Sequence, residues 1–316
     1  MDIKHNQIRL VATGRYTPER VMTNAQLETI VDTTDEWITT RTGIKERRFA
    51  AENEDTSDIA AKAALNAFSK SNYDTSKIDL IIVATFTADL KSPSVANFVQ
   101  AKTGLNDRPI TCFDVNAACT GFIYALNVAS QMLTAGNYHS ALVIGSEKIT
   151  KVTDFTDRNT CVLFGDGAGA VILERDERPH SRPWLFFTAS RGDLDQILYV
   201  DNYVHMEGQK VYQFASKAID SSIRSLLDYD QMTPEDIDVF IPHQANIRII
   251  QSAAKSLGLA MDHFFVNVDK YGNTSAASIP IALDEYLEQY PSEQERTLIM
   301  VGFGAGLTWG ACRINA

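Results

Sequence analysis

Short apolar runs alternate along the chain with segments of helical spacing. Asp79–Ala84 and Ala141–Ile144 are nearly continuous apolar runs, which is typical of strands buried on both faces. Val211–Asp228 instead carries its apolar residues three and four positions apart, which predicts an amphipathic helix. Because buried strands and helices alternate, we expect an α/β fold in which crossover helices join parallel strands.

The same criteria predict the remaining elements. Further strands are expected over Ile8–Ala12, Ile110–Val115, His139–Gly145, Trp184–Thr188, Gln196–Tyr203 and Ile237–Ile241. Further helices are expected over Ala25–Val31 with Asn24 as its N-cap, Asp58–Phe68 with Thr56 or Ser57 as cap, Val95–Thr103, Gly121–Leu133 and Asn246–Leu257.

Gly165–Gly169, followed by Ala170, matches the Gly-x-Gly-x-x-Ala pattern of dinucleotide-binding proteins. That pattern requires a helix after the glycines, with the phosphate at the helix N-terminus. Here the β-rich run Ala-Val-Ile-Leu follows. We therefore predict a glycine-lined hairpin between two strands and no nucleotide site.

Several features of the first half recur in the second half in the same order. Both halves contain a buried strand after a short acidic turn, a strand that leads into a turn and helix, a strand ending in glycine, and a Phe-Gly-x-Gly stretch before the last strand. A duplicated α/β unit places equivalent turns side by side at the junction of its halves. We expect a site to be assembled there.

Composition narrows the class of protein. The 316 residues include 40 acidic and 29 basic ones, a formal net charge of −11 that argues against general nucleic-acid binding. The four cysteines, Cys112, Cys119, Cys161 and Cys312, have neither metal spacing nor the density of a disulfide framework, so no metal is expected. The N-terminus lacks a secretory apolar segment and no run approaches a membrane span, so we expect a reducing cytoplasm.

Cys119 lies in a turn of small residues between a predicted strand and a predicted helix. At the first turn of a helix, unpaired N–H groups and the helix dipole favour a thiolate, which is the nucleophilic form of cysteine. The alternative is that Cys119 is a small core residue, as most free cysteines are.

The duplication indicates which second-half turns approach Cys119. They contain His243, at the end of a strand, and Asn273, before a helix. The glycine loop Gly302–Gly306 supplies backbone N–H groups that could bind an oxyanion. His243 could instead be a satisfied core histidine and Asn273 a helix cap, but three such residues at equivalent strand ends favour a catalytic group.

Six motifs together resemble those of the 3-oxoacyl-(acyl-carrier-protein) synthase III family, from about Ile8 to the C-terminus. They are Asp35–Ile44 (DEWITTRTGI), Ala117–Phe122 (AACTGF), Phe164–Gly169 (FGDGAG), Pro242–Ile249 (PHQANIRI), Gly272–Pro280 (GNTSAASIP) and Gly306–Gly310 (GLTWG). The resemblance implies a thiolase-like α/β fold, with two duplicated halves stacked as five α-β-α-β-α layers. The halves would span residues 1–174, carrying the cysteine, and 175–316, carrying the histidine and asparagine.

The resemblance also implies the reaction. An acyl group, acetyl or a larger or branched one, passes from coenzyme A to Cys119. Malonyl on acyl carrier protein then loses carbon dioxide, and its carbanion attacks the acyl-enzyme to give a 3-oxoacyl product that starts type II fatty acid synthesis. His243 and the Asn273 amide would donate to the malonyl thioester oxygen, provided that His243 is neutral. The resemblance implies no cofactor beyond the coenzyme A thioester substrate. It also implies that the protein is a homodimer.

The remaining site residues also come from the resemblance. The backbone N–H groups of Cys119 and Ala305 would form a second oxyanion hole. Coenzyme A would contact Trp37, Arg41, Arg158, Gly208, Asn246 and Arg248, and Arg248 and Lys255 would dock the acidic carrier. Trp37 and Arg41 share a helix face, and a flat aromatic beside a guanidinium can sandwich a purine.

Three features depart from the family pattern. Ala305 stands where a third glycine is usual, so it would be strained if it needed a positive φ. Ser92 aligns with a bulky residue that reaches across the dimer and limits the acyl pocket, so a larger primer is expected. The stretch Gly192–Met206 is shorter than usual, which affects the pocket roof.

Two other functions use the same residues. A cysteine hydrolase could employ Cys119, His243 and Asn273 as a triad and release free acid, and a non-catalytic relative could only bind acyl-CoA. A 3-hydroxy-3-methylglutaryl-CoA synthase would also need a glutamate base. No glutamate lies in Thr85–Leu90, where this fold would place it.

Overall fold

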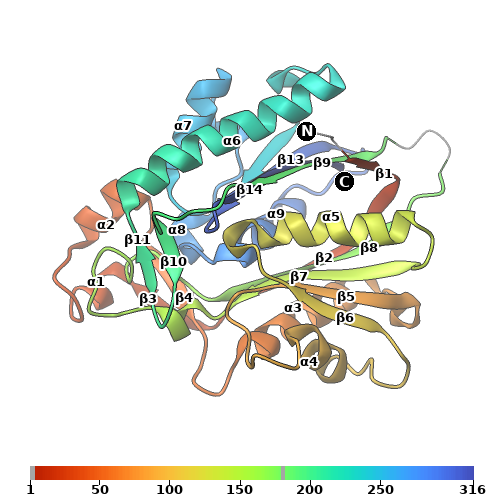
Figure 1. The fold of residues 1–316 in the computed structure, drawn as a ribbon, viewed down its shortest axis with the longest axis horizontal. Coiled ribbons are helices and arrows are strands. Elements are labelled where there is room, and N and C mark those ends of the chain that lie inside the picture. The colour runs from red at the N-terminus through yellow and green to blue at the C-terminus, as the bar shows by residue number, and fades with distance from the viewer. Residues whose placement is uncertain (1–3, 179–181) are drawn as a thin grey trace.

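Two five-stranded sheets and three layers of helices make up the molecule, stacked as α-β-α-β-α (Figure 1). The structure is a computed structural model, and it describes residues 4–178 and 182–316. This arrangement confirms the thiolase-like fold predicted from the sequence.

The first sheet has the strand order β2-β8-β7-β5-β6. The strands are β2 (Ile8–Tyr16), β8 (Gly167–Arg175), β7 (Ser140–Glu147), β5 (Ile78–Ala84) and β6 (Thr111–Val115). The central strand β5 runs parallel to both β6 and β7, whereas β8 is antiparallel to β7 and to β2. The carboxyl ends of the three parallel strands therefore meet at one edge of the sheet.

The second sheet has the order β1-β9-β14-β13-β12. Its strands are β1 (Lys4–Asn6), β9 (Trp184–Ser190), β14 (Thr308–Asn315), β13 (Thr297–Gly304) and β12 (Val239–Pro242). The parallel pair β12–β13 corresponds to β5–β7, and a parallel bridge from Phe240 to Phe264 stands where β6 stands in the first sheet. The order of equivalent elements confirms the internal repeat. The strand β1 is the exception to a division at residue 174, because it pairs with β9 of the second half.

Helices fill the three remaining layers (Figure 1). One outer layer is α3 (Thr56–Ser71) and α4 (Val95–Lys102), the other is α6 (Gly208–Asp230) and α7 (Ile247–Leu257), and the middle layer is α5 (Gly121–Thr134) and α9 (Ser278–Gln289). The largest buried apolar cluster lies around the middle layer and draws on both sheets. Since α5 and α9 both begin at the sheet junction, their first turns face each other there.

Smaller elements surround the site. They are α1 (Asn24–Leu27), α2 (Asp35–Thr42), the pair β3 (Arg20–Thr23) and β4 (Glu46–Phe49), the hairpin β10 (Leu198–Val200) and β11 (Val204–Met206), and α8 (Val268–Tyr271). No helix in the described part of the chain is long and apolar enough to cross a membrane.

Several predicted boundaries were wrong. Thr23 rather than Asn24 caps α1, which is also shorter than expected, and Asp55 rather than Thr56 or Ser57 caps α3. The strand expected over Gln196–Tyr203 is a short hairpin that continues to Met206. The glycines were expected in a hairpin between two strands, but Gly167 and Gly169 lie within β8 itself. A long connection joins β7 to β8 and ends in this glycine stretch.

The glycines at this junction have a packing role. A Cβ on Gly145 would lie 2.2 Å from the carbonyl oxygen of Ala276, and one on Gly169 would lie 2.6 Å from the backbone nitrogen of Ile281. Both distances are far below van der Waals contact. The first turns of the second-half helix can therefore approach the first sheet only because these strand positions lack a side chain.

Candidate active site

Cys119 lies where the two halves meet, in a 3-10 turn, Ala118–Thr120, between β6 and α5. Ala118 has a φ of +48°, a left-handed conformation that is strained for any residue other than glycine. Gly304 packs directly on this turn, since a Cβ there would lie 2.8 Å from the Cys119 nitrogen. The turn thus presents the cysteine at the start of α5, as the sequence predicted.

The thiol is nevertheless not the easily ionised group that the helix start suggested. Burial raises the pKa of Cys119 to about 12, and a hydrogen bond with the Ser275 side chain acts in the opposite direction. Desolvation favours the neutral thiol because it penalises the charged form. In the free protein the thiol therefore keeps its proton at neutral pH, and something must accept that proton when Cys119 reacts.

His243 follows β12 directly and is buried. Its Nδ1 lies 2.6 Å from Ser278 Oγ, and that oxygen also accepts the Gln244 backbone N–H at 3.3 Å. In the tautomer in which the Ser278 hydroxyl donates to Nδ1, the ring proton lies on Nε2. Nε2 is buried without a protein partner within the described residues.

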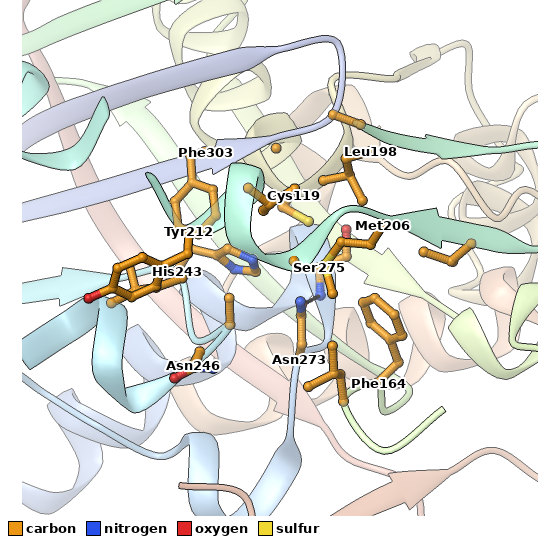
Figure 2. A pocket seen from close by; sticks show the side chains of 18 of the residues that line it. Cys119, Phe164, Leu198, Met206, Tyr212, His243, Asn246, Asn273, Ser275 and Phe303 are labelled. Carbon is orange, nitrogen blue, oxygen red and sulfur yellow. Dashed lines mark hydrogen bonds between the residues drawn. The ribbon is translucent and has the colours of Figure 1, made fainter. Parts of the chain in front are cut away.

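Burial lowers the pKa of His243 to about 3, so the imidazole is neutral over the physiological range. Figure 2 shows the ring lying beside Phe303 and near Cys119, and the two ring centroids of His243 and Phe303 are 5.2 Å apart. A neutral ring with its proton on Nε2 is a hydrogen-bond donor. This is the state that the sequence-based interpretation required.

Asn273 lies in the chain between α8 and α9, and its backbone is bonded to the first half. Its N–H donates to Leu163 O at 2.8 Å, and its carbonyl accepts from Gly165 N at 3.1 Å. Its side-chain Oδ1 accepts the Ser275 N–H at 2.9 Å, which orients the amide nitrogen as the remaining donor. In Figure 2 the Asn273 side chain points toward Cys119 and His243.

Ala305 lies at the turn between β13 and β14 and lines the same cavity as Cys119. Its φ is not positive, whereas Gly306 has a φ of +130°. The strain considered for an alanine at this position therefore does not arise, because the glycine after it takes the unusual conformation.

One cavity of about 910 Å³ connects the three side chains to the surface. Apolar side chains from both halves form its inner wall: Phe86, Val162, Leu163, Phe164, Leu198, Val204, Met206, Val211 and Phe303. The β10–β11 hairpin provides the roof, so the short Gly192–Met206 segment does bear on the cavity. The size and apolar lining fit a ligand with an extended hydrocarbon part.

Charged and aromatic groups surround the mouth of the cavity. The guanidinium carbons of Arg41 and Arg158 lie 4.6 Å and 5.2 Å from the Trp37 ring centroid. Trp37 and Arg41 line the cavity, whereas Arg158 lies outside the lining and donates to Asp32 O at 3.0 Å. Three of the four expected nucleotide contacts, all but Arg248, are thus brought together as one stacked group.

Of the expected pantetheine contacts, Gly208 and Asn246 both line the cavity. Asn246 also caps α7, accepting from Arg248 N at 2.8 Å and donating to Arg41 O at 3.1 Å. Only one amide hydrogen of Asn246 therefore remains for a ligand. Arg248 lines the mouth and donates to Thr40 O at 2.8 Å.

Two expected residues lie away from the cavity. Lys255 is exposed two turns beyond Arg248 on α7, and it is positioned for a partner rather than for a small ligand. Ser92 is exposed on the connection between β5 and α4 and does not line the cavity of its own chain. A role for Ser92 in the primer pocket stays a prediction that depends on a second copy of the chain.

Sequence reasoning missed three polar residues of the site. Ser275 and Ser278 lie in the GNTSAASIP motif, where the sequence indicates no role for them, yet they interact with Cys119 and His243 respectively. Glu147 was missed because it looks like the first polar residue after a buried strand. In the structure it is buried at the end of β7, where Thr85, Phe86 and Thr87 donate hydrogen bonds to it. Those three residues begin the Thr85–Leu90 loop, which itself contains no glutamate.

No group of three or more His, Cys, Asp or Glu side chains in residues 4–178 and 182–316 could hold a metal ion. What the site offers is a nucleophile, two neutral hydrogen-bond donors and an apolar cavity. Such a set can carry out acyl transfer and can stabilise an oxyanion.

Comparisons with known proteins show the family of the chain. Sequence models described as 3-oxoacyl-[acyl-carrier-protein (ACP)] synthase III and as its C-terminal part match residues 113–192 and 227–316. The beta-ketoacyl-[acyl-carrier-protein] synthase III of Acholeplasma laidlawii is 51% identical over 313 residues, which are 99% of this chain and 100% of the relative. The same enzyme of Clostridium acetobutylicum is 48% identical, covering 97% of this chain and 98% of the relative.

A solved structure of 3-oxoacyl-[acyl-carrier-protein] synthase III from Aquifex aeolicus superposes with a TM-score of 0.92 at 42% identity. The match covers 98% of this chain and 100% of that one.

Proposed function

This chain belongs to the 3-oxoacyl-[acyl-carrier-protein] synthase III family, and on that premise we propose that it condenses an acyl-CoA primer with malonyl-acyl carrier protein. The product is a 3-oxoacyl-acyl carrier protein, with loss of carbon dioxide, and the reaction starts type II fatty acid synthesis. The observation that carries this proposal is the convergence of Cys119, His243 and Asn273, from two halves of the chain, on one cavity.

In the first stage the Cys119 sulfur attacks the thioester carbonyl of the primer. The tetrahedral oxyanion accepts hydrogen bonds from the backbone N–H groups of Cys119 and Ala305. Coenzyme A leaves as its thiol, and the acyl group stays on Cys119. A thiolate suits this role because it is both a good nucleophile and a good leaving group.

In the second stage malonyl-acyl carrier protein occupies the space that coenzyme A has left. His243 Nε2–H and the Asn273 amide donate to the malonyl thioester oxygen. This stabilises the enolate that forms as carbon dioxide departs. The carbanion then attacks the acyl-enzyme and expels the Cys119 thiolate. Both donors are neutral, so they favour the enolate without removing a proton from the substrate.

We propose that primers larger than acetyl are accepted, because the inner wall of the cavity is apolar and the roof hairpin is short. A scan of acetyl, branched and medium-chain CoA thioesters with malonyl-carrier, following carbon dioxide and 3-oxoacyl product, tests this. Release of free acid without condensation would mean a cysteine hydrolase. No turnover with any primer would leave only acyl-CoA binding.

The same experiment with Cys119→Ala tests the nucleophile. We expect no covalently attached acyl group on that variant by intact-protein mass spectrometry. A labelled acyl group that still attaches would exclude Cys119 as the acceptor.

We propose that coenzyme A binds with its nucleotide at Trp37, Arg41, Arg158 and Arg248. Its pantetheine arm then passes Gly208 and Asn246. The carrier protein would present the same arm and would dock on Arg248 and Lys255. No resident cofactor is proposed. The four cysteines are all free, which supports a reducing cytoplasm.

We also propose a homodimer. The strand β6 forms one edge of the first sheet, and none of its five residues is fully buried. An exposed sheet edge is a template for pairing with another chain. Pairing of two β6 edges would bring the Ser92 loop toward the partner. Light scattering should give twice the mass of one chain, and the mass of a single chain would contradict the proposal.

A further inference from the structure

Glu147, the last residue of β7, is a fully buried carboxylate without a cationic partner in the part of the chain that the structure describes. Four donors hold it. They are the hydroxyls of Thr87 at 2.6 Å and Thr85 at 3.1 Å, and the backbone N–H groups of Thr87 at 3.2 Å and Phe86 at 3.3 Å. Burying a charge without an opposite one is costly, so such a residue calls for an explanation.

A further contact connects Glu147 to the reacting sulfur. The Ser275 hydroxyl donates to Glu147 Oε1 at 3.4 Å, and Ser275 also interacts with the Cys119 sulfur, whose pKa it lowers. Figure 2 shows Ser275 beside Cys119 on the cavity wall. Ser275 is itself buried and has a φ of +49°, a strained conformation for serine. Ser275 thus stands between the sulfur and the carboxylate and interacts with both.

The surroundings leave Cys119 as the titratable group that faces Glu147. The loop residues Thr85, Phe86 and Thr87 do not titrate in the accessible range, and neither does Ser275. The neighbouring Lys148 turns its ammonium group to the carbonyl oxygens of Ala51 and Glu54.

Other nearby charged or ionisable groups are engaged elsewhere. Asp89, on the same loop, accepts from the backbone and hydroxyl of Ser57. The His243 ring is bonded to Ser278. Cys119 is therefore the titratable group that interacts with Glu147, and it does so through Ser275.

We propose that Glu147 is a positioning residue that accepts the thiol proton of Cys119 through the Ser275 hydroxyl when the primer is transferred. The inference rests on the proposed condensing function. As sulfur attacks the primer carbonyl, its proton passes to Ser275 Oγ, and the serine proton passes to Glu147 Oε1. The C–S bond to coenzyme A breaks, and the departing thiolate takes a proton from solvent.

The second stage reverses the transfer. When the carbanion expels the Cys119 thiolate, Glu147 returns its proton through Ser275, and the thiol is restored. Glu147 thus begins and ends each productive cycle as a carboxylate, the form that predominates above about pH 8, and the net proton consumed is the one on released coenzyme A. Burial raises the pKa of Glu147 to about 8, which brings its proton affinity closer to that of a thiol.

The test is single-turnover acylation, with acetyl-CoA and no malonyl substrate, followed by intact-protein mass spectrometry at a series of pH values. In the unmodified protein the acylation rate should rise with pH, with a midpoint near pH 8. In Glu147→Gln it should fall on the order of 100-fold and lose that midpoint, because the acceptor no longer ionises. Glu174→Gln, which replaces a carboxylate at the far end of the neighbouring strand β8, is the matched control and should behave as the unmodified protein.

Ser275→Ala keeps the backbone N–H that Asn273 accepts, and it should reproduce the Glu147→Gln rate and flat profile. The double variant should be no slower than the slower single variant, since both changes interrupt one path. This second variant keeps the test decisive if Glu147→Gln does not fold.

The proposal is overturned if either variant keeps the rate and the pH midpoint of the unmodified protein. A slower variant that retains the midpoint also overturns it, because that is the behaviour of a structural role. If the unmodified protein forms an acyl-enzyme neither with acetyl-CoA nor with any larger acyl-CoA, the proposed condensing function has failed, and that outcome is distinct from both.

Discussion

At the scale of single residues, the bond between His243 and Ser278 decides which ring nitrogen carries the proton. Ser278→Ala removes the donor to Nδ1 and frees the other tautomer, in which Nε2 cannot donate. We expect carbon dioxide release from malonyl-carrier to fall roughly 10- to 100-fold, because the oxyanion loses one hydrogen-bond donor in the fraction of molecules that adopt the other tautomer. The measurement is carbon dioxide release compared with acylation of Cys119 in the same preparation. An equal fall in both would indicate general disruption of the fold instead.

The stability of the protein should also depend on Glu147 in a defined direction. Burial raises the pKa of Glu147 to about 8 from 4.5, so between these pH values the folded state holds a proton that the unfolded state releases. Stability therefore falls as pH rises through this window, by up to about 1.4 kcal/mol per pH unit, and stays lower above pH 8. Urea unfolding of Glu147→Gln should lack this part of the slope.

The control for that measurement has the opposite sign. The pKa of Glu174 is lowered by the Tyr73 and Arg9 side chains, which outweigh its partial burial. Its contribution to stability is present at neutral pH and is lost as pH falls. Glu174→Gln should thus leave the alkaline slope unchanged. If the slope persists in Glu147→Gln, the buried carboxylate is not its source.

At the scale of elements, the close approach of β7 to the Ser275–Ala277 turn controls the site. A Cβ in Gly145→Ala would meet Ala276 O at 2.2 Å and push away the turn that carries Ser275, with Asn273 just before it. We expect a loss of roughly 3 kcal/mol in unfolding free energy, at the upper end for overpacking, and loss of condensation. Gly192→Ala is the matched control, since a Cβ there meets nothing within 4 Å. If both variants are equally stable, the contact is not limiting.

The elements that the sequence predicted well are those with strong periodicity. The strand β5 and the helix α7, with Gly258 as its left-handed C-cap, match their predicted positions within a residue or two. The first cap was misplaced because Thr23, like Asn24, has a side chain able to accept from the backbone, and only the fold decides between them. The roof hairpin was predicted as one strand because its polar turn residues, Asp201 and Asn202, were included with the apolar run that precedes them.

At the scale of the whole molecule, the internal repeat was enough to predict from the sequence alone that His243 and Asn273 lie near Cys119. Equivalent strand ends meet at the junction of a duplicated fold, so the order of the motifs along the chain predicts which residues meet there. Nothing comparable indicates Glu147. It approaches Ser275 only because two glycines let the halves pack closely, and such a contact between distant segments leaves no local pattern in the sequence.

Charge at this scale leads to the last prediction. The chain carries a formal net charge of −11, so an acidic carrier is repelled overall and must find a local basic surface. Lys255 is exposed on α7, two turns beyond the cavity mouth at Arg248. Lys255→Glu should raise KM for malonyl-carrier about 10-fold at low salt and leave KM for acyl-CoA unchanged, because reversing one rim charge costs about 1–2 kcal/mol.

The control for docking is Lys77→Glu. Lys77 is exposed at the amino end of β5, opposite the carboxyl ends where the site lies, and the substitution changes net charge equally. Steady-state kinetics at two salt concentrations separate the cases, since added salt screens exposed charges and should narrow the difference caused by Lys255→Glu. Equal effects of both substitutions would mean that net charge alone acts. No effect of either would place the carrier on another surface.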